Sequence, residues 1–162
     1  MTQEWRDELN RLATEFWFRS GNLAEVTPWV ESAFEAGETD ADVVHLWDCT
    51  DLELVRSLLQ TLAWKINQFH PWSDAAQPFA LAVLQKQLHH YLAQEISPPM
   101  LCRLVDDLDA AFLDKQDPEG SERWMGNLWN CCDWCTDSWT FENVPSLRDE
   151  AVSVLQKLRS IK

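Results

Sequence analysis

Residues 119–143 read EGSERWMGNLWNCCDWCTDSWTFEN and hold four of the ten tryptophans and three of the five cysteines of this chain. On a helix, positions three and four apart share a face, and one apolar stripe then contains Met125, Leu128, Trp129, Cys132, Cys135 and Trp139. Trp124, Cys131 and Trp134 form a second stripe on another side. Because a helix that is apolar around most of its circumference is normally buried, we predict that this stretch is the central helix of the fold.

The rest of the chain has the spacing of further helices that would pack around it. Three segments, residues 52–69, 98–112 and 147–161, carry apolar side chains at helical period, and alternating strand-like patterns are absent. At 162 residues the chain is long enough for one domain with a substantial core. The sequence therefore predicts an all-α fold, a single compact domain (residues 1–162) of seven or eight helices around the buried Trp/Cys-rich helix.

Acidic residues outnumber basic ones, and they are unevenly distributed. The 27 acids and 13 bases give a net charge of −14. Residues 1–56 hold 13 acids and 4 bases, a net of −9, and residues 106–150 hold 12 acids and 3 bases, again −9. Such a charge disfavours binding to nucleic acid or to an anionic membrane surface. With neither a signal peptide nor a membrane-spanning stretch in the sequence, a cytoplasmic protein is expected.

The first acidic segment has no lysine or arginine between Arg19 and Arg56. A solvated helix face usually interleaves both signs of charge, so this segment is a candidate surface for a basic protein partner. Trp47 stands among these acids as the best aromatic anchor, and Trp29 is the second candidate. The predicted binding residues here are Glu38, Asp40, Asp42, Trp47, Asp48, Asp51 and Glu53. For Asp40, Asp51 and Glu53 a structural interpretation is equally open, because carboxylates favour the first turn of a helix.

The second acidic segment contains Asp106, Asp107 and Asp109, which fall outside the apolar stripe of their predicted helix. We expect them to be exposed and to belong to the binding surface. Asp133 and Asp137 could join them if one edge of the tryptophan helix reaches water.

The cysteines do not form a recognised ligand pattern. A closed zinc site needs four ligands, usually in two separated pairs, and only Cys132 and Cys135 form a C-x-x-C. We therefore expect free thiols packed as small apolar groups, with no metal and no cofactor. No nucleophile elbow, phosphate-binding glycine loop or H-E-x-x-H is present, so an enzyme is not expected. A metal or redox protein centred on Cys131, Cys132 and Cys135 stays an alternative.

The chain resembles the immunity proteins of bacterial polymorphic toxins and contact-dependent growth inhibition systems. The features that carry the resemblance are the acid-rich residues 38–53, the cluster at residues 106–109 and the Trp/Cys-rich residues 126–135. The resemblance implies a protein, monomeric when free, that binds a cognate toxin domain, a nuclease with a basic cleft, and blocks access to its substrate. An acidic mimic of nucleic acid that occupies a DNA-binding protein is the other binding function considered.

Overall fold

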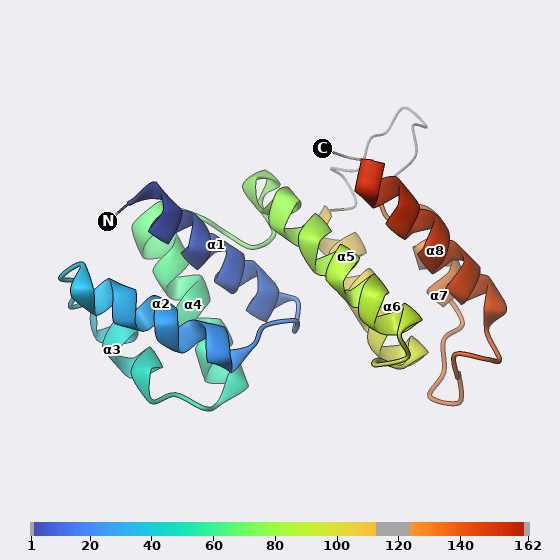
Figure 1. Ribbon diagram of the computed structural model, residues 1–162, viewed down its shortest axis with the longest axis horizontal. Helices are drawn as coiled ribbons and strands as arrows, with labels where there is room; N and C mark the ends of the chain where they lie inside the picture. Colours follow the sequence, from blue (N-terminus) through green and yellow to red (C-terminus); the bar gives the residue numbers. More distant parts are fainter. Residues whose placement is uncertain (1, 113–123, 161–162) are drawn as a thin grey trace. The chain divides into compact units, whose positions relative to one another are not determined.

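The computed structural model describes residues 2–112 and 124–160, and within these ranges the chain is entirely helical and turn, with no strand. The prediction of an all-α fold is confirmed, and the described residues form eight α-helices and one short 3₁₀ helix (Figure 1). No helix in this part of the chain has the length and apolarity needed to cross a membrane. The elements are α1 (Gln3–Trp17), α2 (Leu23–Glu35), α3 (Ala41–Trp47), α4 (Leu52–Asn67), η1 (Asp74–Ala76), α5 (Gln77–Leu92), α6 (Pro98–Phe112), α7 (Leu128–Cys132) and α8 (Pro145–Ser160).

Contacts along the chain group into two compact units. Unit 1 is Met1–Ala80 and unit 2 is Leu81–Lys162, so that the boundary falls inside α5. The prediction of a single domain stays a prediction.

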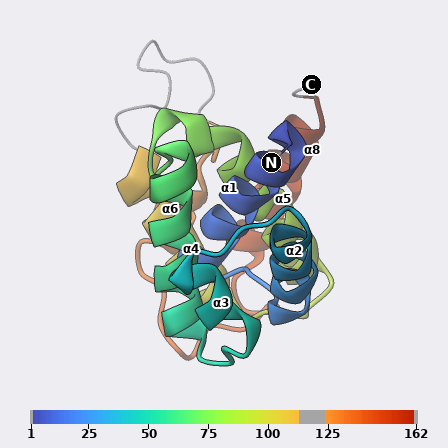
Figure 2. The ribbon, with the colours of Figure 1, turned by 90° about the vertical axis from the view of Figure 1, so that its left-hand side faces the viewer.

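Unit 1 is built from the first four helices. α1 packs against both α2 and α4, and α3 contacts α2 and α4 (Figure 2). The helices begin at polar caps, because Asn22, Asp40 and Asp51 each accept a hydrogen bond from a backbone N–H in the first turn that follows. Their inner faces supply a core of completely buried side chains: Leu9, Leu12, Val30, Val43, Val55, Leu59 and Leu62.

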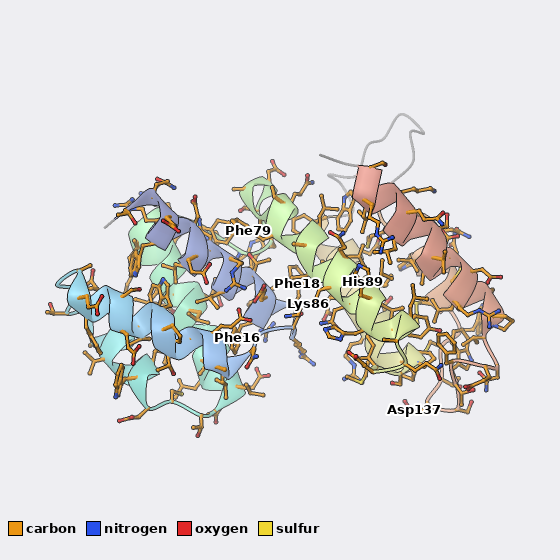
Figure 3. All side chains as sticks on the ribbon, in the orientation of Figure 1. Phe16, Phe18, Phe79, Lys86, His89 and Asp137 are labelled. Carbon is orange, nitrogen blue, oxygen red and sulfur yellow. A yellow bond between two sulfur atoms is a disulfide. The ribbon has the colours of Figure 1, made fainter. Side chains whose placement is uncertain are left out.

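The end of α1 turns sharply toward α2. Phe16 and Phe18, at the C-terminal end of the helix (Figure 3), are both buried, and Arg19 adopts a left-handed backbone with a φ of 58°. A Cβ at Gly21 would overlap the ring of Phe16. The glycine is therefore required here for the close approach of the chain to this ring.

Four aromatic rings and one guanidinium form a continuous series of contacts in unit 1, in which Trp17 and Trp72 are tilted by 50° and the other ring pairs are stacked. The guanidinium of Arg56 lies 4.1 Å from the ring centre of Trp17, which contacts Trp72 at 4.7 Å between centroids. The ring of Trp72 stacks on His70 at 4.7 Å, and His70 stacks on Trp64 at 4.5 Å. Three of the ten tryptophans thus serve packing within this unit.

Unit 2 joins α5 to the last three helices. Tyr91 of α5 is completely buried and its ring lies 5.4 Å from that of Phe141, in the segment between α7 and α8. α7 contacts both α6 and α8. The core comes from side chains at helical spacing, as the sequence predicts for residues 98–112 and 147–161: Leu101, Val105, Leu108, Phe112, Leu147, Ala151 and Val154.

The prediction of a long buried helix that carries Trp124 to Trp139, within residues 119–143, is wrong. Residues 119–123 lie outside the described part of the chain, and of the remainder only Leu128–Cys132 is helical. Met125, Leu128 and Cys132 are buried, but Trp129 is 46% exposed and Trp134 is 82% exposed. The helix cannot extend further back, because Gly126 has a left-handed backbone with a φ of 53°. Most of the apolar residues of the described part of this stretch lie in turns and irregular segments and not in a helix.

Candidate protein-binding surfaces

The predicted binding residues of the first acidic segment, within residues 38–53, lie in the turn before α3, in α3 itself and at the start of α4. Several of its carboxylates are used locally. Oε1 of Glu38 accepts hydrogen bonds from the backbone N–H groups of Thr39 (2.9 Å) and Asp40 (3.0 Å). Oδ1 of Asp40 accepts from the N–H of Asp42 at 2.8 Å, and Oδ1 of Asp51 accepts from the N–H of Leu54 at 3.0 Å. Asp40 and Asp51 therefore cap the first turns of α3 and α4, which is the structural interpretation that the sequence left open for them.

A lysine that is distant in sequence neutralises part of this segment. Nζ of Lys65, on α4, lies 2.5 Å from Oδ2 of Asp42 and 3.4 Å from Oδ2 of Asp40. The hydrogen bond to Asp42 and the charges of both carboxylates raise the pKa of Lys65. Glu53 has a longer contact, 3.6 Å, to Arg56. Asp40, Asp42 and Glu53 therefore have counter-ions although no basic residue lies between Arg19 and Arg56.

Trp47 is exposed, as predicted, and has a partner that the sequence did not suggest. It is 42% exposed at the end of α3, and its ring lies 5.6 Å from that of Phe34 on α2, which is 39% exposed. In the sequence, the exposure of Phe34 could have been inferred from its position outside the apolar stripe of α2, whose buried residues are Val26, Trp29, Val30 and Ala33. Asp48 follows Trp47 directly, is exposed and forms no ion pair with any described residue. Trp29, in contrast, is 3% exposed, and it is not a surface anchor.

The second acidic segment lies on α6 in unit 2. Asp106 and Asp107 are exposed and Asp109 is half-buried, and none of the three forms an ion pair within residues 2–112 and 124–160. Partial burial, followed by the charges of Asp107, Asp109 and Asp133, raises the pKa of Asp106. The disulfide between Cys102 of α6 and Cys132 of α7 holds the end of α7, and Asp133 directly after it, close to α6. Asp133 is exposed in this turn, whereas the sequence placed it on the edge of a long helix.

The turn after α7 also carries a large exposed aromatic side chain, Trp134, directly after Asp133 in the chain. Burial first, then the charges of Asp106 and Asp137 (labelled in Figure 3), raises the pKa of Cys135. Asp133 and Cys135 are therefore both close enough to Asp106 to interact electrostatically, and Trp134, at 82% exposure, stands between them. We call Asp106, Asp107, Asp109, Asp133 and Trp134 the α6–turn surface. The sequence missed Trp134 because it placed this side chain on a buried helix.

The cysteines differ from the expected set of free thiols. Cys102 of α6 and Cys132 of α7 form a disulfide, with Cα atoms 5.3 Å apart, while Cys49, Cys131 and Cys135 are free. Burial, and then the charge of Glu150, raises the pKa of Cys131. Cys131 and Cys135 are thus held as neutral thiols, which are poor nucleophiles and poor metal ligands. Among the described residues no three His, Cys, Asp or Glu side chains are grouped to hold a metal ion.

The ten predicted binding residues consequently lie in two places. Glu38, Asp40, Asp42, Trp47, Asp48, Asp51 and Glu53 belong to unit 1, and Asp106, Asp107 and Asp109 belong to unit 2. Each set is considered as a candidate surface of its own unit. Comparison with known proteins finds no matching family model, no similar curated protein and no similar solved structure. The functional argument therefore depends on the residues of this chain alone.

Proposed function

We propose that this protein binds a basic protein partner through the α6–turn surface. The observation that carries the proposal is a group of four carboxylates, Asp106, Asp107, Asp109 and Asp133, none of which forms an ion pair with a described residue. The residue that follows Asp133 in the chain, Trp134, has an indole that is 82% exposed. Carboxylates that repel one another reduce the stability of the free protein. A partner that brings lysine or arginine side chains relieves this repulsion on binding.

The exposed tryptophan supplies what charge alone lacks. Interfaces commonly depend on a few aromatic or arginine anchors surrounded by polar residues, and tryptophan is enriched among them. Trp134 would act as the anchor and the carboxylates around it as the guiding charges. Complementary charge mainly speeds association and selects the partner, whereas burial of the indole slows dissociation.

The biological role that best fits such a surface is that of an immunity protein, which binds the nuclease domain of a cognate bacterial toxin and blocks its basic cleft. It would act in the cytoplasm as a monomer until it meets the toxin. Disulfides are uncommon in that reducing compartment, so the proposal requires that the fold tolerates a reduced Cys102–Cys132 pair. Alkylation of thiols in a freshly prepared cell extract measures the state of this pair.

Trp47 and Phe34 in unit 1 are a second exposed aromatic group, but the acids around them are better neutralised. Lys65 pairs with Asp40 and Asp42, and Asp40 and Asp51 already bind backbone N–H groups. Such partly occupied carboxylates are also poorly suited to a mimic of nucleic acid, which needs a row of free negative charges. Trp47 and Asp48 therefore provide the matched control variants for the α6–turn surface.

The test uses the C-terminal domain of the protein encoded directly upstream of this chain. Expressed alone it should stop growth, and co-expression of this chain should restore growth. Calorimetry should show tight one-to-one binding that weakens as salt increases. Trp134→Ala should weaken binding by about 30-fold or more, the effect expected of an interface anchor, and the double variant Asp106→Asn with Asp107→Asn should slow association.

The controls, Trp47→Ala and Asp48→Asn, should change the affinity by less than about 3-fold. An upstream domain that does not inhibit growth, or one that this chain fails to bind, would remove the immunity role. Binding that is insensitive to Trp134→Ala but lost in Trp47→Ala would move the interface to unit 1.

A further inference from the structure

A pocket of about 490 Å³ lies in unit 1 between the N-terminal half of α1 and α2, and its lining shares no residue with either acidic surface described above. α1 and α2 are adjacent helices in Figure 1. The pocket has the size of small-ligand sites, and its lining combines two indoles with three carboxylates, from Glu4, Glu8 and Glu25.

The two indoles form a stacked pair. The rings of Trp5 and Trp29 are 4.7 Å apart between centroids with an interplanar angle of 20°. Nε1 of Trp29 donates a hydrogen bond to the backbone oxygen of Trp5 at 3.3 Å, which ties α2 to α1 and fixes the pair. Indole faces attract cations more strongly than the other aromatic rings do.

The carboxylates give the pocket an excess of negative charge. Arg11 is shared among three acids, since its guanidinium lies 2.5 Å from Glu8, 2.7 Å from Glu15 and 2.7 Å from Glu25. One positive charge thus faces three negative ones, and two of these, Glu8 and Glu25, line the pocket. Glu4 adds a further carboxylate that has no ion pair within the described residues. A cation that enters the pocket meets this uncompensated charge.

One buried donor in the lining lacks an acceptor. Trp5 is 8% exposed, and its Nε1 atom is buried with no hydrogen-bond partner among the described residues. A buried N–H of this kind usually has a partner, so its absence points to a group that arrives from outside. The ligand that suits the pocket therefore carries a positive charge and, close to it, a neutral hydrogen-bond acceptor. A carboxylate or phosphate group on the ligand is disfavoured, because Glu4, Glu8 and Glu25 at the rim of the pocket would repel it.

We propose that this pocket binds an arginine side chain of an extended peptide segment. A guanidinium is planar and weakly hydrated, so it can lie against the part of the indole pair that borders the pocket and still donate to the carboxylates of Glu4, Glu8 and Glu25. The carbonyl of the adjacent peptide bond accepts from Nε1 of Trp5. This site is independent of the α6–turn surface, and its test does not require the proposed toxin.

The test follows the indole N–H signals of the full chain by NMR. The Trp5 signal is assigned by its loss in a Trp5→Phe variant. Titration with the peptide acetyl-Gly-Arg-Gly-amide should move the Trp5 signal in a saturable way, with a dissociation constant in the millimolar range. The binding should weaken as the salt concentration rises. The matched peptide with citrulline, which has the shape of arginine without its charge, should bind at least about 10-fold more weakly.

A charge variant tests the rim without disturbing the packed indoles. Glu4→Gln should weaken the binding of the arginine peptide by about 2- to 4-fold. Glu31→Gln, which removes an exposed carboxylate of α2 that does not line the pocket, should leave the affinity unchanged. Equal binding of the citrulline peptide, or a Trp5 signal that does not move with either peptide, would overturn the proposal.

Discussion

The carboxylate of Glu150 on α8 accepts a hydrogen bond from the backbone N–H of Asn127, with 2.8 Å between Oε1 and N. Asn127 directly precedes α7, and the residue before it, Gly126, has a left-handed backbone. A Cβ at Gly126 would lie 2.7 Å from Oε1 of Glu150 and 2.8 Å from Cγ2 of Val154. The tight turn that starts α7 is thus held against α8 by an acid and needs a glycine.

The first prediction concerns this turn. Gly126→Ala should reduce the free energy of unfolding by about 2–3 kcal/mol, because the left-handed backbone costs an alanine about 1 kcal/mol and the methyl group also displaces Glu150 and Val154. Chemical denaturation followed by circular dichroism measures the change. Gly37→Ala is the matched control: Gly37 has a φ of 82° with nothing within 4 Å of an added Cβ, so only the backbone cost of about 1 kcal/mol applies. Equal losses in the two variants would show that the contact with α8 is unimportant.

The regular helices α6 and α8 could be predicted from the sequence, whereas the turn before α7 could not. α6 begins at the first-turn proline Pro98, and both α6 and α8 follow the predicted apolar spacing closely, because a first-turn proline and a regular stripe are local signals. In residues 124–139 the stripe is also present, but the left-handed Gly126 interrupts it and the bond from Cys132 to Cys102 anchors it to α6. Neither constraint can be read from spacing.

Charge pairing has the same limit. The excess of carboxylates in residues 1–56 is evident from the sequence, but the counter-ions that it acquires are decided by packing. Arg11 reaches Glu25 across α1 and α2, and Lys65 reaches Asp42 from α4 to α3. Local i,i+4 spacing suggested neither pair. Asp106 and Asp107 are exposed, as their position outside a regular buried stripe predicts, whereas the exposure of Trp134 could be found only from the structure.

A second prediction concerns the disulfide between Cys102 and Cys132, which closes a loop of 30 residues between α6 and α7. In the chain-entropy account a bond that closes a loop of this length stabilises the fold by about 3–4 kcal/mol. The double variant Cys102→Ala with Cys132→Ala, or reduction of the native protein, should therefore lower the unfolding free energy by roughly that amount. Hydrogen exchange should show the loss in α6–α8 and not in α1–α4.

Cys49→Ala serves as the control for the disulfide, because Cys49 is a free thiol in unit 1. Its unfolding midpoint should stay within about 2 °C of that of the native protein. A reducing agent that leaves the midpoint of the native protein unchanged would contradict the prediction. It would at the same time show that the fold is suited to a reducing compartment.

A third prediction concerns Arg11 and the three carboxylates that it binds. Arg11→Met should lower stability at neutral pH by about 1–3 kcal/mol, because the partly exposed pairs with Glu8 and Glu25 contribute little and the buried Glu15 is left unpaired. The hydrogen bond from Arg11 lowers the pKa of Glu8 below its ordinary value of 4.5. The stability from this pair is present above pH 4.5 and is lost as the pH falls below it.

The difference between the native protein and Arg11→Met should therefore be largest above about pH 5 and should narrow as Glu8 is protonated. Denaturation curves at pH 3, 5 and 7 measure this difference. Arg6→Met, which removes a half-buried arginine with no ion pair to a described residue, is the control and should show a smaller, pH-independent change. A gap that widens toward low pH would contradict the assignment to Glu8.

The last prediction links stability to the proposed binding surface. Partial burial and the neighbouring charges of Asp107, Asp109 and Asp133 raise the pKa of Asp106, so ionisation of this carboxyl costs more in the folded chain than in the unfolded one. Asp106→Asn should therefore stabilise the protein at pH 7, by less than about 1 kcal/mol because the side chain is exposed. The gain should vanish as the pH falls below 3.8, the ordinary pKa of aspartate, because Asp106 is then protonated in both the folded and the unfolded chain.

The control is Asp48→Asn, which removes the same charge from unit 1 and should give no comparable gain in stability. A stabilising substitution that also slows association with a basic partner would identify Asp106 as a residue whose charge serves binding at the expense of the fold, whereas a destabilising one would mean that its carboxylate holds unit 2 together.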